Sequence, residues 1–275
     1  MCGIVGFISL NNNLRLSGMS AVSNMLDKIS YRGPDQRGVS QYDSVVLGMN
    51  RLSIIDTETH SIPYEDPQKR GALVFNGEIY NHKEIRNSLG EDQYYETNSD
   101  SETLLYDFIK RGSSGLKEYN GMYAIAYYDR IEKILTLARD KAGEKPIYYV
   151  KTDDFFAFAS EIKCLLEIVK PELNMTLSYR AFEFSVGRDT LFKGIKQLLP
   201  GELLTINLRG EIALKSYWKI WDSNLHVSDD ESKIEKDLTE LIEDAILLRT
   251  RNCVHSFAIF TGGGVDSALM ACISK

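Results

Sequence analysis

The chain has 275 residues, of which 43% are hydrophobic and 26% are charged, a composition typical of folded globular domains. Lys and Arg total 32 against 39 Asp and Glu, which gives a formal net charge of -7. An acidic chain without a run of Lys and Arg is a poor candidate for binding a nucleic-acid backbone, so no nucleic-acid partner is expected.

Short strands dominate the first two-thirds of the chain. Enrichment in β-branched and aromatic residues predicts strands over residues 3–9, 45–51, 72–75, 122–128, 134–139, 147–151, 155–159 and 203–208. Helical spacing of apolar residues predicts helices over 20–29, 82–89, 101–111, 161–169 and 177–186. Several strands follow one another without a helix between them, which indicates an α+β fold of antiparallel sheets rather than a doubly wound sheet.

The pattern changes near Asp222, where residues 222–230 form a polar linker. We therefore place a first domain at residues 2–222. A charged amphipathic helix over 232–249, an apolar strand over 257–260, a glycine loop over 261–265 and a second helix follow. Strand, glycine loop and helix in this order are typical of a phosphate-binding α/β unit. One strand and two helices cannot enclose a core, so residues 223–275 are interpreted as the incomplete start of a second domain.

Cysteine and histidine are scarce. The four cysteines lie far apart without a CxxC pair, and the four histidines form no HExxH motif, so we expect neither a disulfide framework nor a metal site. No apolar stretch approaches the ~18 residues of a membrane span, and the N-terminus carries no basic leader. We expect a cytoplasmic protein that does not bind a membrane.

Cys2 follows the initiator Met1 directly. Because cysteine is small, an aminopeptidase is expected to remove Met1 and expose the α-amine of Cys2. An α-amine has a pKa of about 7.7–8.0, which suits a general base near neutral pH. It can activate the thiol of its own residue without a histidine, as in N-terminal threonine nucleophiles. One alternative is a small hydrophobic residue at the start of a strand, and another is a papain-like pairing of Cys2 with His82.

Eight motifs, of which the Cys2 segment is the first, occur in a fixed order and favour the catalytic interpretation. They are Cys2-Gly3-Ile4-Val5-Gly6, Arg32-Gly33-Pro34-Asp35, Arg51-Leu52-Ser53-Ile54-Ile55-Asp56, Phe75-Asn76-Gly77-Glu78-Ile79-Tyr80-Asn81, Gly121-Met122-Tyr123-Ala124, Arg139-Asp140, Lys145-Pro146-Ile147-Tyr148-Tyr149 and Phe158-Ala159-Ser160-Glu161-Ile162-Lys163. This set resembles the glutamine-hydrolysing asparagine synthetases over residues 2 to about 220. The N-terminal domain of that family is a class II glutamine amidotransferase with the N-terminal-nucleophile hydrolase fold, an αββα sandwich of antiparallel sheets.

The resemblance implies a role for each of the matching residues. Cys2 would attack the side-chain amide of glutamine, form a γ-glutamyl thioester and release ammonia. Asn76 and Gly77 would stabilise the oxyanion, a task in which one donor is worth about 3 kcal/mol. The other implied glutamine-binding residues are Arg51 for the α-carboxylate, Asp100 with Glu78 for the α-ammonium, and the segment Leu52, Ser53, Ile54 and Ile55.

Two of these residues also have structural interpretations. Asn76-Gly77 between apolar segments is a strong hairpin-turn signal, and a turn is compatible with an oxyanion role. Ser99 and Asp100 precede a predicted helix, and either can serve as its N-cap. Arg32-Gly33-Pro34-Asp35 is interpreted as a structural turn near the site, and the segments at 145–149 and 158–163 as core and scaffold.

The loop at 261–267 resembles the pyrophosphate loop of ATP pyrophosphatases, which implies contacts of Gly262, Gly263, Gly264, Asp266 and Ser267 with ATP. Gly262 stands where that pattern usually has serine. ATP and Mg²⁺ are expected for the reaction of the full family, in which ammonia amidates an adenylated carboxylate, and neither is needed to hydrolyse glutamine. Most of such a synthetase domain is absent, so this chain alone is not expected to make asparagine.

The acceptor stays open at this point. Aspartate is the acceptor in the family; a sugar acid or another carboxylate, with a separately encoded synthetase part, is the alternative. A phosphoribosyl or sugar-phosphate acceptor and a non-catalytic regulatory module are further alternatives. The expected partners are glutamine, a second polypeptide that completes the synthetase and a second copy in a homodimer.

Overall fold

The computed structural model describes residues 1–11, 15–54, 61–90, 95–174, 186–222, 230–250 and 257–274. The chain divides into two compact units. The first contains Met1–Ser53 and Glu58–Lys219, and the second contains Ile54–Thr57 and Ile220–Lys275. Each unit is described by itself.

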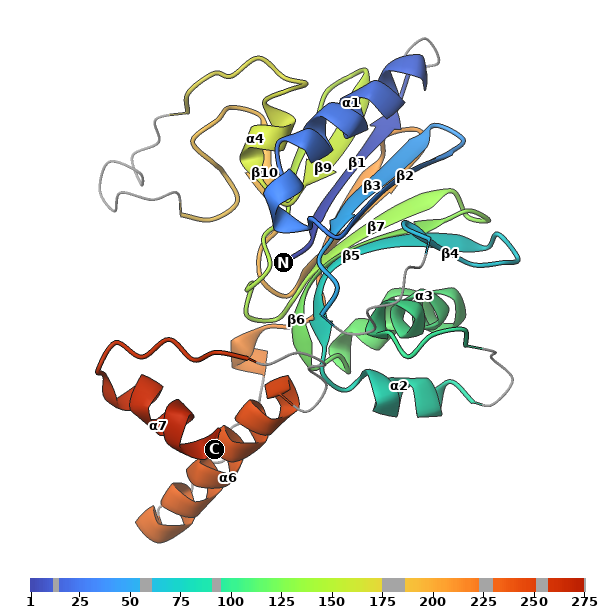
Figure 1. Cartoon of the computed structure of the whole chain (residues 1–275). Helices are drawn as coiled ribbons and strands as arrows, with labels where there is room; N and C mark the ends of the chain where they lie inside the picture. The colour runs from blue at the N-terminus through green and yellow to red at the C-terminus, as the bar shows by residue number, and fades with distance from the viewer. Residues whose placement is uncertain are drawn as a thin grey trace. The chain divides into compact units, whose positions relative to one another are not determined.

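Two six-stranded sheets form the centre of the first unit, and all strand pairs are antiparallel (Figure 1). The first has the order β10-β8-β9-β1-β3-β2 and the second β12-β11-β7-β6-β5-β4. The strands are β1 (Gly3–Ser9), β2 (Gln36–Tyr42), β3 (Val45–Arg51), β4 (Tyr64–Glu65), β5 (Gly71–Ile79), β6 (Gly121–Asp129), β7 (Ile134–Arg139), β8 (Tyr148–Lys151), β9 (Phe155–Ala159), β10 (Ile195–Gln197), β11 (Glu202–Asn207) and β12 (Ile212–Ser216).

Helices cover the outer face of each sheet. On the first sheet, α1 (Arg15–Asp27) packs on β1 and β3, and α4 (Ile162–Leu165) packs on β9. On the second, α3 (Asp100–Arg111) packs on β5 beside α2 (His82–Ser88), as Figure 1 shows. The layers helix, sheet, sheet, helix confirm the predicted αββα sandwich of the α+β class.

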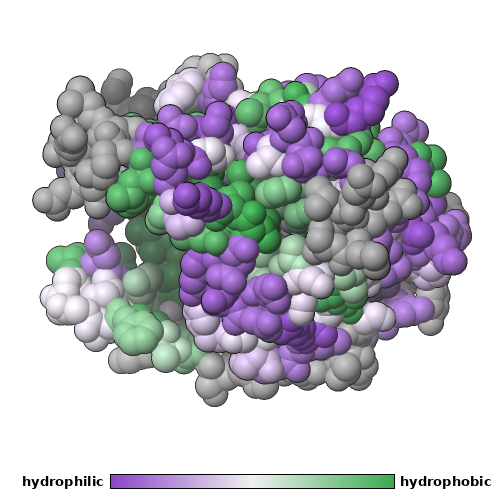
Figure 2. Space-filling model, turned by 90° about the horizontal axis from the view of Figure 1, so that it is seen from above, coloured by the Kyte–Doolittle hydropathy of each residue, from purple (hydrophilic) through white to green (hydrophobic). Residues whose placement is uncertain are grey.

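Strand β1 is buried on both faces because it separates two layers of core. Ile4 and Ile8 belong to the core between the sheets, whereas Val5 and Phe7 belong to the core beneath α1. A strand of this kind reads as a continuous apolar run, which is why the sequence predicts its bounds. The outer surface seen in Figure 2 mixes hydrophilic and hydrophobic side chains, as is usual for globular proteins.

All eight strands predicted for the first unit are present, and β1, β3, β7 and β9 have the predicted bounds. The strands β2, β4, β10 and β12 were not predicted. The helix predicted at 161–169 is shorter, since α4 ends at Leu165. Residues 177–185 of the last predicted helix, and residues 223–229 of the predicted linker, lie outside the described residues.

The second unit contains α6 (Glu231–Thr250) and α7 (Val265–Ile273), which contact each other. The strand predicted at 257–260 is wrong, because these residues form no regular element and Phe260 is 96% exposed. A strand needs the backbone of a neighbouring strand, and no described residue pairs with this segment. No helix in the described part of the chain is both long and apolar enough to cross a bilayer.

A buried carboxylate fixes the loop between β7 and β8. The Asp140 side chain is fully buried and accepts the backbone N–H groups of Tyr123, Glu144 and Lys145 at 3.2, 2.9 and 2.9 Å. Asp140→Ala leaves three backbone donors without this partner, two of them on the buried residues Tyr123 and Lys145, so we expect the free energy of unfolding to fall by about 3 kcal/mol. Denaturant titration measures it. The exposed Asp153→Ala is the control, and an equal loss in both variants would contradict this role.

Candidate active site

The first strand of the chain brings Cys2 to the end of β3. Gly3 pairs with Asn50, so the residue before the strand lies beside the residues that follow β3. The Leu52 N–H donates to the Cys2 sulfur at 3.4 Å, and the thiol faces the Leu52 carbonyl oxygen at 3.7 Å. The nominated nucleophile is therefore held against the backbone of the nominated glutamine-binding segment.

The segment Arg32–Asp35 supports this strand end from outside. The Arg32 Nε–H donates to the Cys2 carbonyl oxygen at 2.9 Å, and the Asp35 carboxylate accepts the Ser53 N–H at 2.7 Å. At Gly33 a Cβ would lie 2.3 Å from the Asn50 carbonyl oxygen, so only glycine fits there. These contacts hold residues 51–53 in place around the thiol.

Arg51 is the last residue of β3 and is 4% exposed. Its Nη1 lies 3.4 Å from the Gln36 side-chain oxygen on the neighbouring strand. Burial raises the pKa of the Cys2 thiol, while the Leu52 N–H, the terminal amino group and Arg51 lower it and Asp100 raises it. Both nominated recognition charges therefore lie within electrostatic reach of the sulfur.

Asp100 reaches the site from the first turn of α3. Its Oδ2 accepts the Ile79 N–H at 3.0 Å, which ties the helix to the end of β5. Burial raises the pKa of this carboxyl, and the Ile79 N–H and the charge of His82 oppose the rise. The N-cap is Ser99, which accepts the Glu102 N–H at 3.2 Å, so the alternative that Asp100 is the cap is wrong.

Asn76 and Gly77 come from the second sheet. They lie inside β5, paired with Ala124 and Tyr123 of β6, so the prediction of a hairpin turn here is wrong. At Gly77 a Cβ would lie 2.0 Å from the Met122 carbonyl oxygen, and glycine is required by this close approach rather than by a turn. The Asn76 amide is 1% exposed, and neither its nitrogen nor its oxygen has a hydrogen-bond partner among the described residues.

An unpartnered buried amide is rare because it costs about 1–3 kcal/mol relative to a hydrogen-bonded one. The Asn76 nitrogen is a donor available to a bound oxygen. Glu78, two residues on, is buried in the same strand at 7% exposure.

Sequence reasoning missed Tyr64 of β4. Burial raises the pKa of its phenol to about 12, and this phenol also senses the charges of Arg51 and Asp100, the Ser101 hydroxyl and the Cys2 thiol. The Tyr64 phenol therefore lies near Cys2, Arg51 and Asp100. A tyrosine after a proline carries no sequence signal for such a position.

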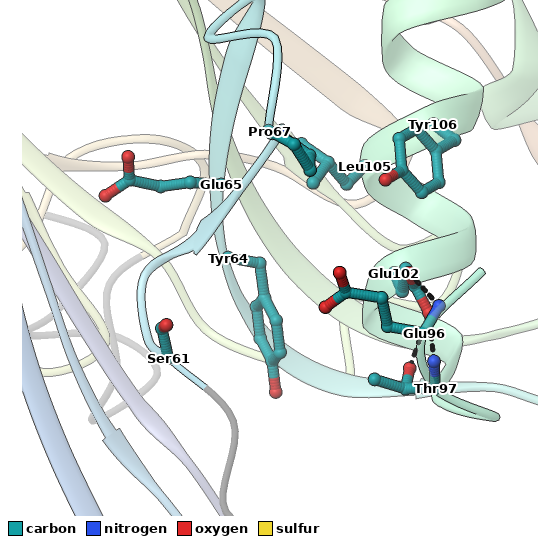
Figure 3. A pocket seen from close by; sticks show the side chains of 9 residues that line it. All are labelled: Ser61, Tyr64, Glu65, Pro67, Glu96, Thr97, Glu102, Leu105 and Tyr106. Atoms are coloured by element: carbon teal, nitrogen blue, oxygen red, sulfur yellow. Dashed lines mark hydrogen bonds between the residues drawn. The ribbon is translucent and has the colours of Figure 1, made fainter. Parts of the chain in front are cut away.

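Tyr64 also lines a pocket of about 350 Å³ (Figure 3). Figure 3 shows Tyr64 on one side and side chains of α3 on the other. The Glu102 carboxylate accepts the N–H groups of Glu96 and Thr97 at 2.9 and 2.8 Å, which fixes this wall. The lining residues are Ser61, Tyr64, Glu65, Pro67, Glu96, Thr97, Glu102, Leu105 and Tyr106.

Of the other nominated residues, Ile54 belongs to the second unit and Ile55 lies outside the described residues. His82 lies 3.0 Å from the Ile79 carbonyl oxygen through its Nδ1, and the hydrogen bonds of the Cys2 sulfur among the described residues go to Leu52. The structure therefore gives no support to a Cys2–His82 pair.

The loop at 262–267 lies in the second unit, where α7 begins at Val265 with Gly264 as its N-cap. The Ser267 hydroxyl donates to the Gly264 carbonyl oxygen at 3.1 Å. Gly262, Gly263, Gly264, Asp266 and Ser267 are exposed or half-buried, and a Cβ at any of the three glycines meets no atom within 4 Å. Within the described residues no group of three or more His, Cys, Asp or Glu is arranged to hold a metal ion.

The family model for the glutamine amidotransferase domain matches residues 1–218. The chain belongs to this family. It is 32% identical over 284 residues to asparagine synthetase [glutamine-hydrolyzing] 1 of Bacillus subtilis (strain 168), a match that covers 100% of this chain and 44% of the relative. It is 30% identical to asparagine synthetase [glutamine-hydrolyzing] 3 of the same strain, with 100% and 45% coverage. The chain thus spans about half the length of these relatives, and its amidotransferase domain is of the asparagine synthetase type.

Solved structures agree with the amidotransferase fold. The glutamine phosphoribosylpyrophosphate amidotransferase of B. subtilis, complexed with ADP and GMP, superposes with a TM-score of 0.56 at 17% identity, covering 79% of this chain and 49% of that one. A structure of the allosteric regulatory enzyme of purine biosynthesis gives 0.59 at 17% identity with the same coverage. At this identity the likeness establishes the N-terminal-nucleophile fold alone.

The raised pKa of the thiol predicts how Cys2 reacts while Met1 is still attached. We expect its alkylation by iodoacetamide to reach half of the maximal rate at a higher pH than that of N-acetylcysteine, because burial disfavours the thiolate. Arg51→Met should move this midpoint further up and Arg51→Lys should not. Peptide mass spectrometry follows the modification. A midpoint at or below that of the free thiol would contradict the electrostatic account.

Proposed function

We propose that this amidotransferase domain hydrolyses glutamine at Cys2 and releases ammonia for transfer to a carboxylate. The observation that carries the proposal is the proximity of the Cys2 thiol to the buried guanidinium of Arg51 and the buried carboxyl of Asp100, which come from separate elements. The unpartnered amide of Asn76 lies in β5, a strand that contacts β1 and β3. Family membership over residues 1–218 supports the same chemistry.

Removal of Met1 would begin the reaction sequence. The side chain of Met1 is 56% exposed, which suits access of an aminopeptidase. The freed α-amine of Cys2 then accepts the thiol proton, and the sulfur attacks the carboxamide carbon of glutamine. Such a base would assist because burial raises the pKa of the thiol.

Residues of both sheets would take part in the remaining steps. Asn76 and the Gly77 N–H would donate to the oxyanion of the tetrahedral intermediate. The C–N bond then breaks, the α-ammonium returns its proton to the leaving nitrogen as ammonia departs, and water hydrolyses the thioester to glutamate. Arg51 would bind the α-carboxylate of glutamine, and Asp100 with Glu78 its α-ammonium.

The fate of the ammonia follows from the relatives. Their names describe glutamine-hydrolysing asparagine synthetases, and this chain covers less than half of their length. We propose that ammonia passes to a synthetase part that amidates aspartate or a related carboxylate such as a sugar acid. That part would lie on a second polypeptide or in further sequence, and homodimer formation stays a prediction.

ATP and Mg²⁺ would enter only with that synthetase part. The residues 262–267 offer backbone donors at the start of α7 but no surrounding wall, and their first turn carries the acidic Asp266. These residues by themselves do not fit a nucleotide site, and no step of the proposed reaction is derived through ATP.

Replacement of the nucleophile tests the proposal directly. Cys2→Ala should abolish glutamate release from glutamine, because no other thiol lies among the nominated residues. In the unaltered protein a diazoketone analogue of glutamine should label Cys2, and intact-mass spectrometry should show that Met1 is absent. Glutamate release by Cys2→Ala would refute the nucleophile assignment. Absence of labelling in the processed protein would favour a non-catalytic regulatory module.

Asn76→Ala removes one proposed oxyanion donor. We expect kcat for glutamine hydrolysis to fall about 100-fold or more, with a smaller change in KM, because the donor acts on charge that develops in the transition state. The exposed Asn120→Ala is the matched control and should retain the activity of the parent. An Asn76→Ala variant that is folded and as active as this control would contradict the oxyanion role.

A further inference from the structure

The side chain of Lys145 contacts Met1, the first residue of the chain. Lys145 lies in the loop between β7 and β8, and its backbone N–H donates to the Asp140 carboxylate at 2.9 Å. Its side chain is buried, with the residue 7% exposed, and its ammonium group donates to the Met1 sulfur at 3.4 Å. The sequence interpretation treated this segment as scaffold, and the contact with Met1 shows that it reaches the N-terminus.

The surroundings of this ammonium are unusual. A thioether is a weak acceptor, and Lys145 forms no ion pair within the described residues. Burial lowers its pKa, the carboxylates of Glu144, Asp140 and Glu78 act in the opposite direction, and the charge of Arg32 lowers it further. A buried ammonium without an ion-pair partner is costly, so a role at this place is expected.

Arg32 is the other cation at this end of the chain, and its charge is compensated. Its Nη1 lies 2.8 Å from a Glu161 carboxylate oxygen, while its Nε holds the Cys2 carbonyl. Lys145 is therefore the cation here whose charge is less balanced. When Met1 leaves, the sulfur partner of Lys145 leaves with it.

The groups that face the terminal amine are both cationic and anionic. Burial lowers the pKa of the Met1 amine; Arg32 and Lys145 lower it further, whereas the Cys2 thiol and Asp35 raise it. Removal of Met1 moves the amine by one residue, about 3.8 Å along the chain, so the same groups remain its neighbours.

We propose that Lys145 is a positioning residue for the proposed reaction: after Met1 is removed, its ammonium group lies beside the α-amine of Cys2 and disfavours a second positive charge there. The amine then stays unprotonated and available as the base for the thiol. This inference rests on the proposed function. It adds to the nominated residues one that would act on the α-amine and has no described contact with the Cys2 sulfur.

The acidic limb of the pH profile is the test. In Lys145→Gln the limb of kcat/KM for glutamine hydrolysis should move to higher pH by about one unit, because a cation near the amine is lost. Lys145→Arg should keep the profile of the parent. Lys141→Gln is the matched control, since Lys141 is half-buried four residues away and donates to the Lys117 carbonyl oxygen at 2.9 Å. Intact-mass spectrometry verifies that Met1 is absent from every variant.

A second measurement titrates the amine without activity. In the Cys2→Ala background, competitive acetylation of the N-terminal amine is measured against pH with and without Lys145→Gln. We expect the midpoint to rise in the double variant. An unchanged midpoint together with an unchanged acidic limb would overturn the role of Lys145 and leave the proposed function standing. Absence of glutaminase activity from the parent at every pH would instead contradict the proposed function.

Discussion

Antiparallel pairing of β1 with β3 is the constraint on which the candidate site depends. The register Gly3 to Asn50 brings the first residues of the chain beside Arg51 and Leu52, fifty positions later. A slip of one residue would turn every side chain of β1 to the opposite face. It would exchange Ile4 and Ile8 with Val5 and Phe7 between two different cores, so the burial of β1 on both faces also fixes where Cys2 lies.

The second sheet contributes a side-chain amide and the backbone donor that holds a carboxylate. Strand β5 supplies Asn76, and the Ile79 N–H at its end holds Asp100 at the start of α3. Around the thiol, burial opposes ionisation while Arg51 and the terminal amine favour it. Burial has the largest effect, so the pKa of the thiol is raised, and the base that we propose for it belongs to its own residue. A low density of histidine in the sequence is consistent with such a device, since the base is part of the backbone.

The sequence predicted those parts of the structure that burial alone determines. Strands β1 and β3 are apolar along their whole length, and their bounds follow. Strand β2 lies at a sheet edge with a polar sequence, which hides it from any hydropathy pattern. The apolar run at 257–260 was predicted to be a strand and is not one, because an apolar sequence forms a strand only where a neighbouring strand can pair with it. Tyr64 lies in the two-residue strand β4, and Lys145 lies in the loop between β7 and β8; no local pattern encodes the course that brings either of them near the N-terminus.

The Asn76-Gly77 pair shows why a local rule fails at this place. Both residues disfavour a strand interior, one by its polar side chain and the other by its lack of one. The fold holds them there because β6 approaches too closely for a Cβ at Gly77. The cost is a buried amide without a hydrogen-bond partner among the described residues. A bound oxygen that develops negative charge would supply that partner. The feature that weakens the domain would then be the one that suits it to stabilising an oxyanion.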